Sequence, residues 1–166
     1  MKRTIRILAT IAAAVGLAYA IDAQAGGADL LGKRPPPIKA AGWLNTTGAP
    51  TLAALKGKVA VVEFWATWCP PCRRSVPRLI EMRRSHAGAD LVIIGLSDEP
   101  KARVEDFAKK MGMNYIVGYG SESGIDYGVD TIPRVFVVGK DGKVAWTGNP
   151  LDRPFEGEVE RALAAK

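Results

Sequence analysis

The chain has 166 residues, enough for one ordinary globular domain, and its 48% hydrophobic and 24% charged residues exclude a disordered chain and a protein with many membrane spans. The net charge of +6 is spread over short basic pairs such as Arg73-Arg74, and no basic run is interleaved with aromatic residues. A basic stripe is the usual signature of nucleic-acid binding, so we expect no nucleic-acid partner.

The first residues have the organisation of an export signal. Residues 1–6 carry three positive charges, and residues 7–21 form an uncharged, alanine-rich apolar stretch. This order, followed by the small residues of Ala23-Gln24-Ala25, predicts a signal peptide (residues 1–25) cleaved at its end or, as a second choice, after Ala20. An uncleaved anchor in the inner membrane is the alternative, because about 15 apolar residues approach the length that spans a bilayer. Both hypotheses place the domain in the periplasm or another extracytoplasmic compartment, where disulfides can persist.

The segment after the export signal predicts a lead-in followed by the domain. Residues 26–37 contain glycines and then become basic and proline-rich, which favours a flexible, extended lead-in. We therefore place the domain over residues 38–166. At its start we expect a short strand over residues 43–46 and a helical turn over residues 51–55.

Strand and helix patterns alternate through the rest of the chain. The run of β-formers from Val59 to Trp65 predicts a strand covered on both faces, and Glu63 is its only charged residue. The later elements are a helix over 75–85, a strand over 91–96, a helix over 100–111, a short strand over 115–117, a short helix over 123–127, a hairpin of strands 135–138 and 144–147, and a closing helix over 154–165. This order predicts an α/β domain whose sheet lies between helix layers.

The only two cysteines lie in Trp68-Cys69-Pro70-Pro71-Cys72, between the predicted strand and a helix. A helix N-terminus favours thiolate over thiol and lowers the pKa of Cys69. With two residues between them, Cys69 can attack a partner disulfide and Cys72 can resolve the mixed disulfide. The alternatives are an inert structural disulfide, whose small loop would restrain little, and half of a zinc site, which would need two more ligands where His86 is the only histidine. The pattern therefore predicts disulfide exchange without a cofactor or a metal.

Residues 61–72 (VVEFWATWCPPC) resemble the active-site segment of thioredoxins, and the Trp-Cys-Pro-Pro-Cys version resembles the exported branch that includes TlpA, ResA and the cytochrome c maturation reductases. The similarity runs from about Ile38 to the C-terminus, with Thr131-Ile132-Pro133 and the terminal hairpin in the family's order. The resemblance implies a thioredoxin-like fold, with a central mixed sheet and helices on both faces. It also implies a reductase of disulfides in envelope proteins such as apocytochrome c, recharged by a membrane thiol donor.

The resemblance also assigns roles to residues around the cysteines. Glu63 occupies the position of a buried aspartate beneath the resolving cysteine, where desolvation would raise the carboxyl pKa and allow it to take the proton of Cys72. A glutamate pointing to solvent from a strand edge is the alternative. Thioredoxins carry a strand lysine near this acid, and residues 91–96 contain none. Pro133 resembles the family's cis-proline, and we expect the substrate to bind on four residues, Trp68, Pro70, Ile132 and Pro133.

Three other functions remain open from the sequence. In a disulfide-forming oxidant the thiolate would need strong stabilisation, which Arg73 and Arg74 favour and Glu63 opposes. A thiol peroxidase would need a Pro-x-x-x-Thr-x-x-Cys setting, whereas Thr67 stands only two residues before Cys69. A Sco-type copper-delivery protein would need three residues between its cysteines and a distant histidine, whereas this chain has two residues between them and no histidine after His86. We expect His86 to be solvent-exposed and Trp65 to lie in the core.

Overall fold

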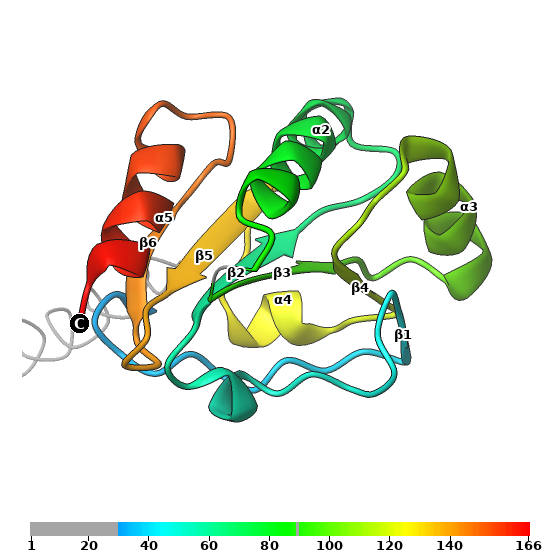
Figure 1. The fold of residues 1–166 in the computed structure, drawn as a ribbon. Coiled ribbons are helices and arrows are strands. Elements are labelled where there is room, and N and C mark those ends of the chain that lie inside the picture. Colours follow the sequence, from blue (N-terminus) through cyan, green and yellow to red (C-terminus); the bar gives the residue numbers. More distant parts are fainter. Residues whose placement is uncertain (1–29, 89) are drawn as a thin grey trace, which may run out of the picture.

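The computed structural model describes residues 30–88 and 90–166, so the expected export signal lies outside the described residues. The elements, shown in Figure 1, are β1 (Gly42–Leu44), the short 3-10 helix η2 (Leu52–Leu55), β2 (Val59–Phe64), α2 (Pro70–Ser85), β3 (Leu91–Leu96), α3 (Lys101–Met111), β4 (Ile116–Tyr119), α4 (Ser123–Asp126), β5 (Arg134–Val138), β6 (Val144–Gly148) and α5 (Pro154–Ala164). Each element expected from the sequence is present; the helix after the cysteines starts at residue 70 instead of 75, and the other ends moved by two residues at most.

The six strands form one mixed sheet in the order β1-β4-β3-β2-β5-β6. Strand β3 pairs parallel with both β2 and β4. The other three pairings, β1 with β4, β5 with β2 and β6 with β5, are antiparallel. Strand β2 lies between β3 and β5 and is buried along its whole length, which explains its near-continuous apolar sequence. The predicted mixed sheet is confirmed.

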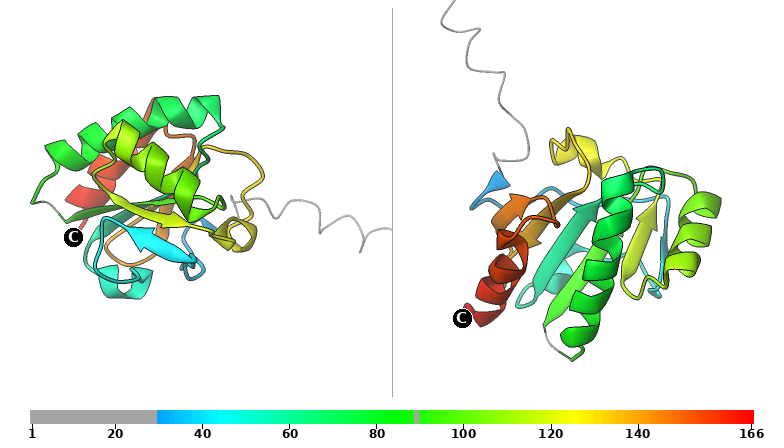
Figure 2. Two further views of the ribbon diagram at one scale, coloured as in Figure 1. Left: turned by 90° about the vertical axis from the view of Figure 1, so that its right-hand side faces the viewer. Right: turned by 90° about the horizontal axis from the view of Figure 1, so that it is seen from above.

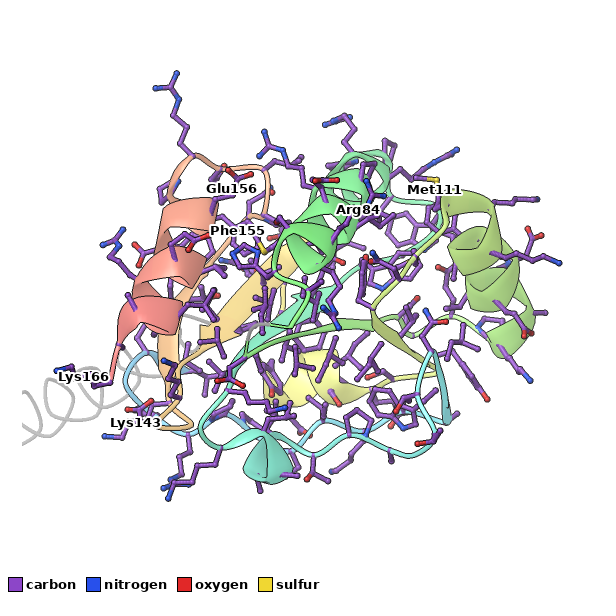
Figure 3. All side chains as sticks on the ribbon, in the orientation of Figure 1. Arg84, Met111, Lys143, Phe155, Glu156 and Lys166 are labelled. Carbon is purple, nitrogen blue, oxygen red and sulfur yellow. A yellow bond between two sulfur atoms is a disulfide. The ribbon has the colours of Figure 1, made fainter. Side chains whose placement is uncertain are left out.

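Helices cover both faces of the sheet, and successive side chains of β2 point alternately to the two faces. Helices α2, α3 and α5 lie on one face, and α4 and η2 lie on the other (Figures 1 and 2). Val59 and Val61 pack in the core beneath α2 and α5, whereas Val62 packs in the core of the opposite face. Phe155 of α5 is fully buried in the first core, and the adjacent Glu156 is exposed (Figure 3). By the same alternation Glu63 points toward α2.

The described part of the lead-in is attached to the edge of the sheet. Leu31 forms a parallel bridge with Val144, and the N–H of Gly32 donates to Val144 O at 2.8 Å. The N–H of Val144 donates in turn to Lys33 O at 2.9 Å. The expected lead-in spans residues 26–37, and residues 31–33 within it pair as an extended segment with the free backbone groups of the edge strand β6.

Within residues 30–88 and 90–166 no helix is long and apolar enough to cross a membrane, and the residues proposed as an anchor lie outside these ranges.

Candidate active site

The cysteine pair lies where the central strand leads into α2. Cys69 is the N-cap of α2, and it forms a disulfide with Cys72, their Cα atoms 5.2 Å apart. Pro70 and Pro71 occupy the first helical positions, where a missing N–H costs no hydrogen bond, and they start the helix earlier than the expected residue 75. The backbone N–H of Cys72 donates to Cys69 Sγ at 3.2 Å. After reduction the same N–H and the positive end of α2 stabilise a thiolate on Cys69.

The Ile132–Pro133 peptide bond, which the resemblance implies to be cis, is cis. The carbonyl oxygen of Ile132 lies 3.7 Å from Cys69 Sγ, so the loop before β5 and the start of α2 meet at this sulfur. Of the other residues expected to bind substrate, Trp68 is 65% exposed and Pro70 is exposed, whereas Pro133 is buried. Cys69 itself is 2% exposed, so a partner disulfide must approach between these neighbours.

A cavity of about 450 Å³ opens beside the cysteine pair. Trp68 and Ile132, the two neighbours of Cys69 described above, both line it. The rest of its lining is mainly apolar, with acidic side chains from two loops, and includes Val129, Ile125, Asp98 and Glu122. Because Ile125 and Trp68 are among the few exposed large apolar side chains of the described residues, this surface can hold an extended segment of another chain.

Glu63 is fully buried under α2, which excludes the solvent-facing alternative. The O–H of Ser75 donates to Glu63 Oε1 at 2.8 Å, and the O–H of Tyr115 donates to Oε2 at 3.4 Å. Burial raises the pKa of Glu63 to about 8, because desolvation penalises the carboxylate more than the two hydrogen bonds favour it. A carboxyl with this pKa can both hold and release a proton near neutral pH.

The space beside Glu63 depends on Gly95, its register partner in β3. A Cβ at this position would lie 2.9 Å from Trp65 Nε1 and 3.2 Å from Tyr115 Cε2. The absence of a side chain at Gly95 therefore leaves room for both rings, and Tyr115 reaches the carboxyl of Glu63. Trp65 is 2% exposed, which confirms its expected place in the core.

A second buried carboxylate holds the loop before the cysteines, and the sequence analysis missed it. Glu99 is 7% exposed and accepts two hydrogen bonds from Thr67, from its N–H at 2.6 Å and from its O–H at 2.7 Å. Ser97 donates a further bond at 3.3 Å, and Arg103 lies 3.7 Å away. Because both carboxylate oxygens are bonded to the residue two positions before Cys69, Glu99 fixes the path of the chain into the site.

Replacing Thr67 with valine keeps the shape of the side chain and removes one of these bonds to the carboxylate. We expect Thr67→Val to lower the free energy of unfolding by about 1–3 kcal/mol, because a buried charged acceptor is left underbonded. Urea denaturation of the oxidised protein measures the loss. The matched control, Thr46→Val in an exposed turn, should change stability by less than about 0.5 kcal/mol. Equal losses in the two variants would contradict the bracing role.

His86 differs from the expectation of an exposed side chain. It is partly buried at the C-cap of α2, with Nδ1 2.8 Å from Met82 O and Nε2 2.8 Å from a carboxylate oxygen of Glu160 in α5. The carbonyl of Met82 and, to a smaller extent, Glu160 raise the pKa of His86. Its contacts therefore join the ends of two helices.

This combination of fold and site defines a class of protein. The site combines a Cys-Pro-Pro-Cys pair at the start of the helix after the central strand with a cis Ile132–Pro133 bond whose Ile132 carbonyl faces the Cys69 sulfur. On a mixed sheet covered by helices, this is the arrangement of a thioredoxin-like thiol-disulfide oxidoreductase. The chain belongs to the Redoxin family, whose model matches residues 32–164. The resemblance to this group of proteins is thereby confirmed.

Individual relatives agree with this assignment. The thiol-disulfide oxidoreductase ResA of Bacillus anthracis is 35% identical over 115 residues, which cover 66% of this chain and 66% of ResA, just under two thirds of that protein. The thiol:disulfide interchange protein HelX of Rhodobacter capsulatus is 33% identical over 130 residues, covering 74% and 70%. A solved thiol:disulfide interchange protein of Chlorobium tepidum matches with a TM-score of 0.66 and 29% identity over 78% of this chain and 96% of that one. A thioredoxin-like superfamily protein matches in fold, with a TM-score of 0.71 and 21% identity over 80% and 97%.

Proposed function

We propose that this chain is an extracytoplasmic thiol-disulfide oxidoreductase that reduces disulfides in envelope proteins, with apocytochrome c as the leading substrate. The observation that carries the proposal is the Cys69–Cys72 pair at the N-terminus of α2, with the carbonyl of Ile132 against its sulfur. Relatives named as a thiol-disulfide oxidoreductase and a thiol:disulfide interchange protein support the reaction class, and the resemblance of the Trp-Cys-Pro-Pro-Cys segment to cytochrome c maturation reductases supports the substrate.

The reaction begins with the reduced pair. The Cys69 thiolate attacks one sulfur of the substrate disulfide, so a Cys69–substrate bond forms and the other substrate sulfur leaves as a thiolate that takes a proton from solvent. Glu63 accepts the proton of the Cys72 thiol, and the Cys72 sulfur attacks Cys69 Sγ. This releases the second substrate thiolate and leaves the disulfide seen in the structure. Two electrons have passed to the substrate, and a membrane thiol donor returns the pair to the dithiol.

Substrate binding would use the exposed surface around Cys69. Trp68, Pro70 and Ile132 offer apolar contact, and the chain before Pro133 offers backbone groups to an extended peptide. The adjoining cavity would hold a side chain of that peptide. A docked segment brings its disulfide to Cys69 despite the low exposure of that residue.

Export would follow from the N-terminal residues. We assign residues 1–25 as the signal peptide, or as an inner-membrane anchor if it is not cleaved, and residues 38–166 as the core of the thioredoxin-like domain. An extracytoplasmic location gives the cysteine pair both disulfide-bearing substrates and a need for an external electron donor.

The experiment that tests this function mixes the reduced protein with a peptide that carries an apocytochrome-type Cys-x-x-Cys-His disulfide. We expect one peptide dithiol to appear for each protein disulfide formed, as measured by mass spectrometry after alkylation. Cys69→Ala should give none, and the conversion should stop when the dithiol protein is consumed. A wild-type protein that leaves the peptide oxidised would contradict the proposed function.

A further inference from the structure

Ser75 occupies a position between the buried acid and the resolving cysteine. Its hydroxyl oxygen lies 2.8 Å from Glu63 Oε1 and 2.9 Å from the backbone oxygen of Cys72. A serine hydroxyl has a single hydrogen, so it can donate to only one of these acceptors at a time, while its oxygen remains free to accept a bond. Two hydrogen-bonding arrangements are therefore open to it.

We propose that Ser75 is the positioning residue for proton transfer at Glu63, because its hydroxyl turns between the carboxyl and the Cys72 carbonyl as Glu63 gains and loses a proton. The proposal rests on the proposed function and deepens it. When Glu63 is ionised, Ser75 donates to Oε1. When Glu63 is protonated, the carboxyl donates to Ser75 Oγ, and the Ser75 hydroxyl donates to Cys72 O.

This exchange keeps Glu63 and Ser75 hydrogen-bonded in both states. Glu63 and Ser75 are 0% exposed, and an unpartnered polar group in such a place destabilises the folded protein. Tyr115 supplies a constant donor to Oε2, because its own pKa is raised far above neutral, chiefly by burial. Glu63 can thus change its charge without leaving an orphaned atom.

Among the described residues, hydroxyl groups and not charged side chains stabilise the Glu63 carboxylate. On the two sides of Glu63 in the sheet, β3 presents Gly95 and β5 presents Val135. The titratable side chains of the surrounding core are Tyr115 and the two cysteines, and no charged group of the described residues contributes to the pKa of Glu63. With no lysine nearby, Ser75 and Tyr115 are the groups that favour the carboxylate.

The position of Ser75 on α2 places its hydroxyl close to the resolving cysteine, Cys72. Ser75 stands three residues after Cys72 on α2, so both side chains lie on one face of the helix. The Ser75 hydroxyl oxygen lies within hydrogen-bonding distance of both the carboxyl and the backbone oxygen of Cys72. The hydroxyl can therefore turn from one acceptor to the other by rotation alone while the proton moves.

Single-turnover reduction of Ellman's reagent separates the relevant steps. Attack by Cys69 releases a first thionitrobenzoate, and resolution by Cys72 releases a second, so the pH profile of the second phase reports the proton acceptor. Loss of one hydrogen bond to the carboxylate should raise the midpoint of this profile by about one pH unit in Ser75→Ala, and slow the second phase about fivefold at pH 8. The first phase should keep its wild-type rate.

Further variants distinguish positioning from folding. Ser75→Thr retains the hydroxyl and should restore the wild-type midpoint, and Tyr115→Phe should raise it by a smaller amount because the bond that it removes is longer. If Ser75→Ala does not fold, Tyr115→Phe together with Ser75→Thr decides the question. Ser85→Ala, at the exposed end of the same helix, should leave the wild-type profile unchanged. The double variant Glu63→Gln/Ser75→Ala should have the same profile as Glu63→Gln alone.

Two results would overturn different claims. If Ser75→Ala shows both release phases and an unshifted midpoint of the pH profile, the proposed role of Ser75 is wrong and the proposed function still stands. A wild-type protein that releases no second thionitrobenzoate would remove the exchange reaction itself, and with it the role of Ser75.

Discussion

Replacing Cys72 with serine should convert the protein into a trap that remains covalently bound to its substrates. Cys69 still sits at the N-terminus of α2 and still attacks a disulfide, but a serine hydroxyl at position 72 is not ionised near neutral pH and cannot displace the substrate sulfur. Turnover should fall to the uncatalysed rate, while mixed disulfides accumulate. Non-reducing electrophoresis and mass spectrometry of an envelope extract would detect and identify them.

The controls for the trap use the same cysteine pair. Cys69→Ser should form no mixed disulfide, and reductant should release all complexes formed by Cys72→Ser. Complexes of equal abundance in Cys69→Ser would contradict the assignment of Cys69 as the attacking residue.

Replacing Glu63 with glutamine should stabilise the folded protein increasingly as the pH rises from 5 to 8. The pKa of Glu63 is about 8 in the folded chain, against an ordinary value of 4.5. Between these values the folded chain holds a proton that the unfolded chain has released, so the free energy of unfolding of the wild type falls as the pH rises. Glutamine has no such loss, and the difference between the two proteins should grow to roughly 3–5 kcal/mol above pH 8.

Urea unfolding of the oxidised proteins at pH 5, 6.5 and 8.5 would measure this difference. Below pH 4.5 Glu63 is protonated in both the folded and the unfolded wild-type chain. The pH-dependent part of the difference in free energy of unfolding between Glu63→Gln and the wild type should therefore vanish. Glu105→Gln, an exposed position on α3, should follow the wild type at every pH. A constant difference between Glu63→Gln and the wild type would show that Glu63 does not carry a raised pKa.

The fold followed from local sequence patterns because each strand and helix has a clear periodicity. The apolar run at 59–65 became the central strand β2, and the Asp141-Gly142 turn joined the two strands of the terminal hairpin. The cysteine motif was sufficient to place the pair at a helix N-terminus. The lead-in was less predictable, because its pairing with Val144 joins residues more than a hundred positions apart.

In the site, too, residues with a local sequence signal could be predicted, and residues that act through long-range contacts could not. Glu63 was recognisable as a charge within an apolar strand, and Ser75 could have been found from its spacing of three residues after Cys72. Tyr115 and Glu99 carried no local signal, because their contacts with Glu63 and Thr67 join residues 52 and 32 positions apart. Such contacts depend on the register of the sheet, which a single sequence does not specify.

The reduction potential of the Cys69–Cys72 pair tests the central claim of a dedicated reductase most directly. Equilibration of the protein in dithiothreitol or glutathione buffers, with the fluorescence of the adjacent Trp68 as the signal, would give its value. We predict a potential near or below that of thioredoxin, about −270 mV, at which the dithiol can donate electrons to substrate disulfides. A potential near about −120 mV would contradict the account and identify the protein as a disulfide-forming oxidant.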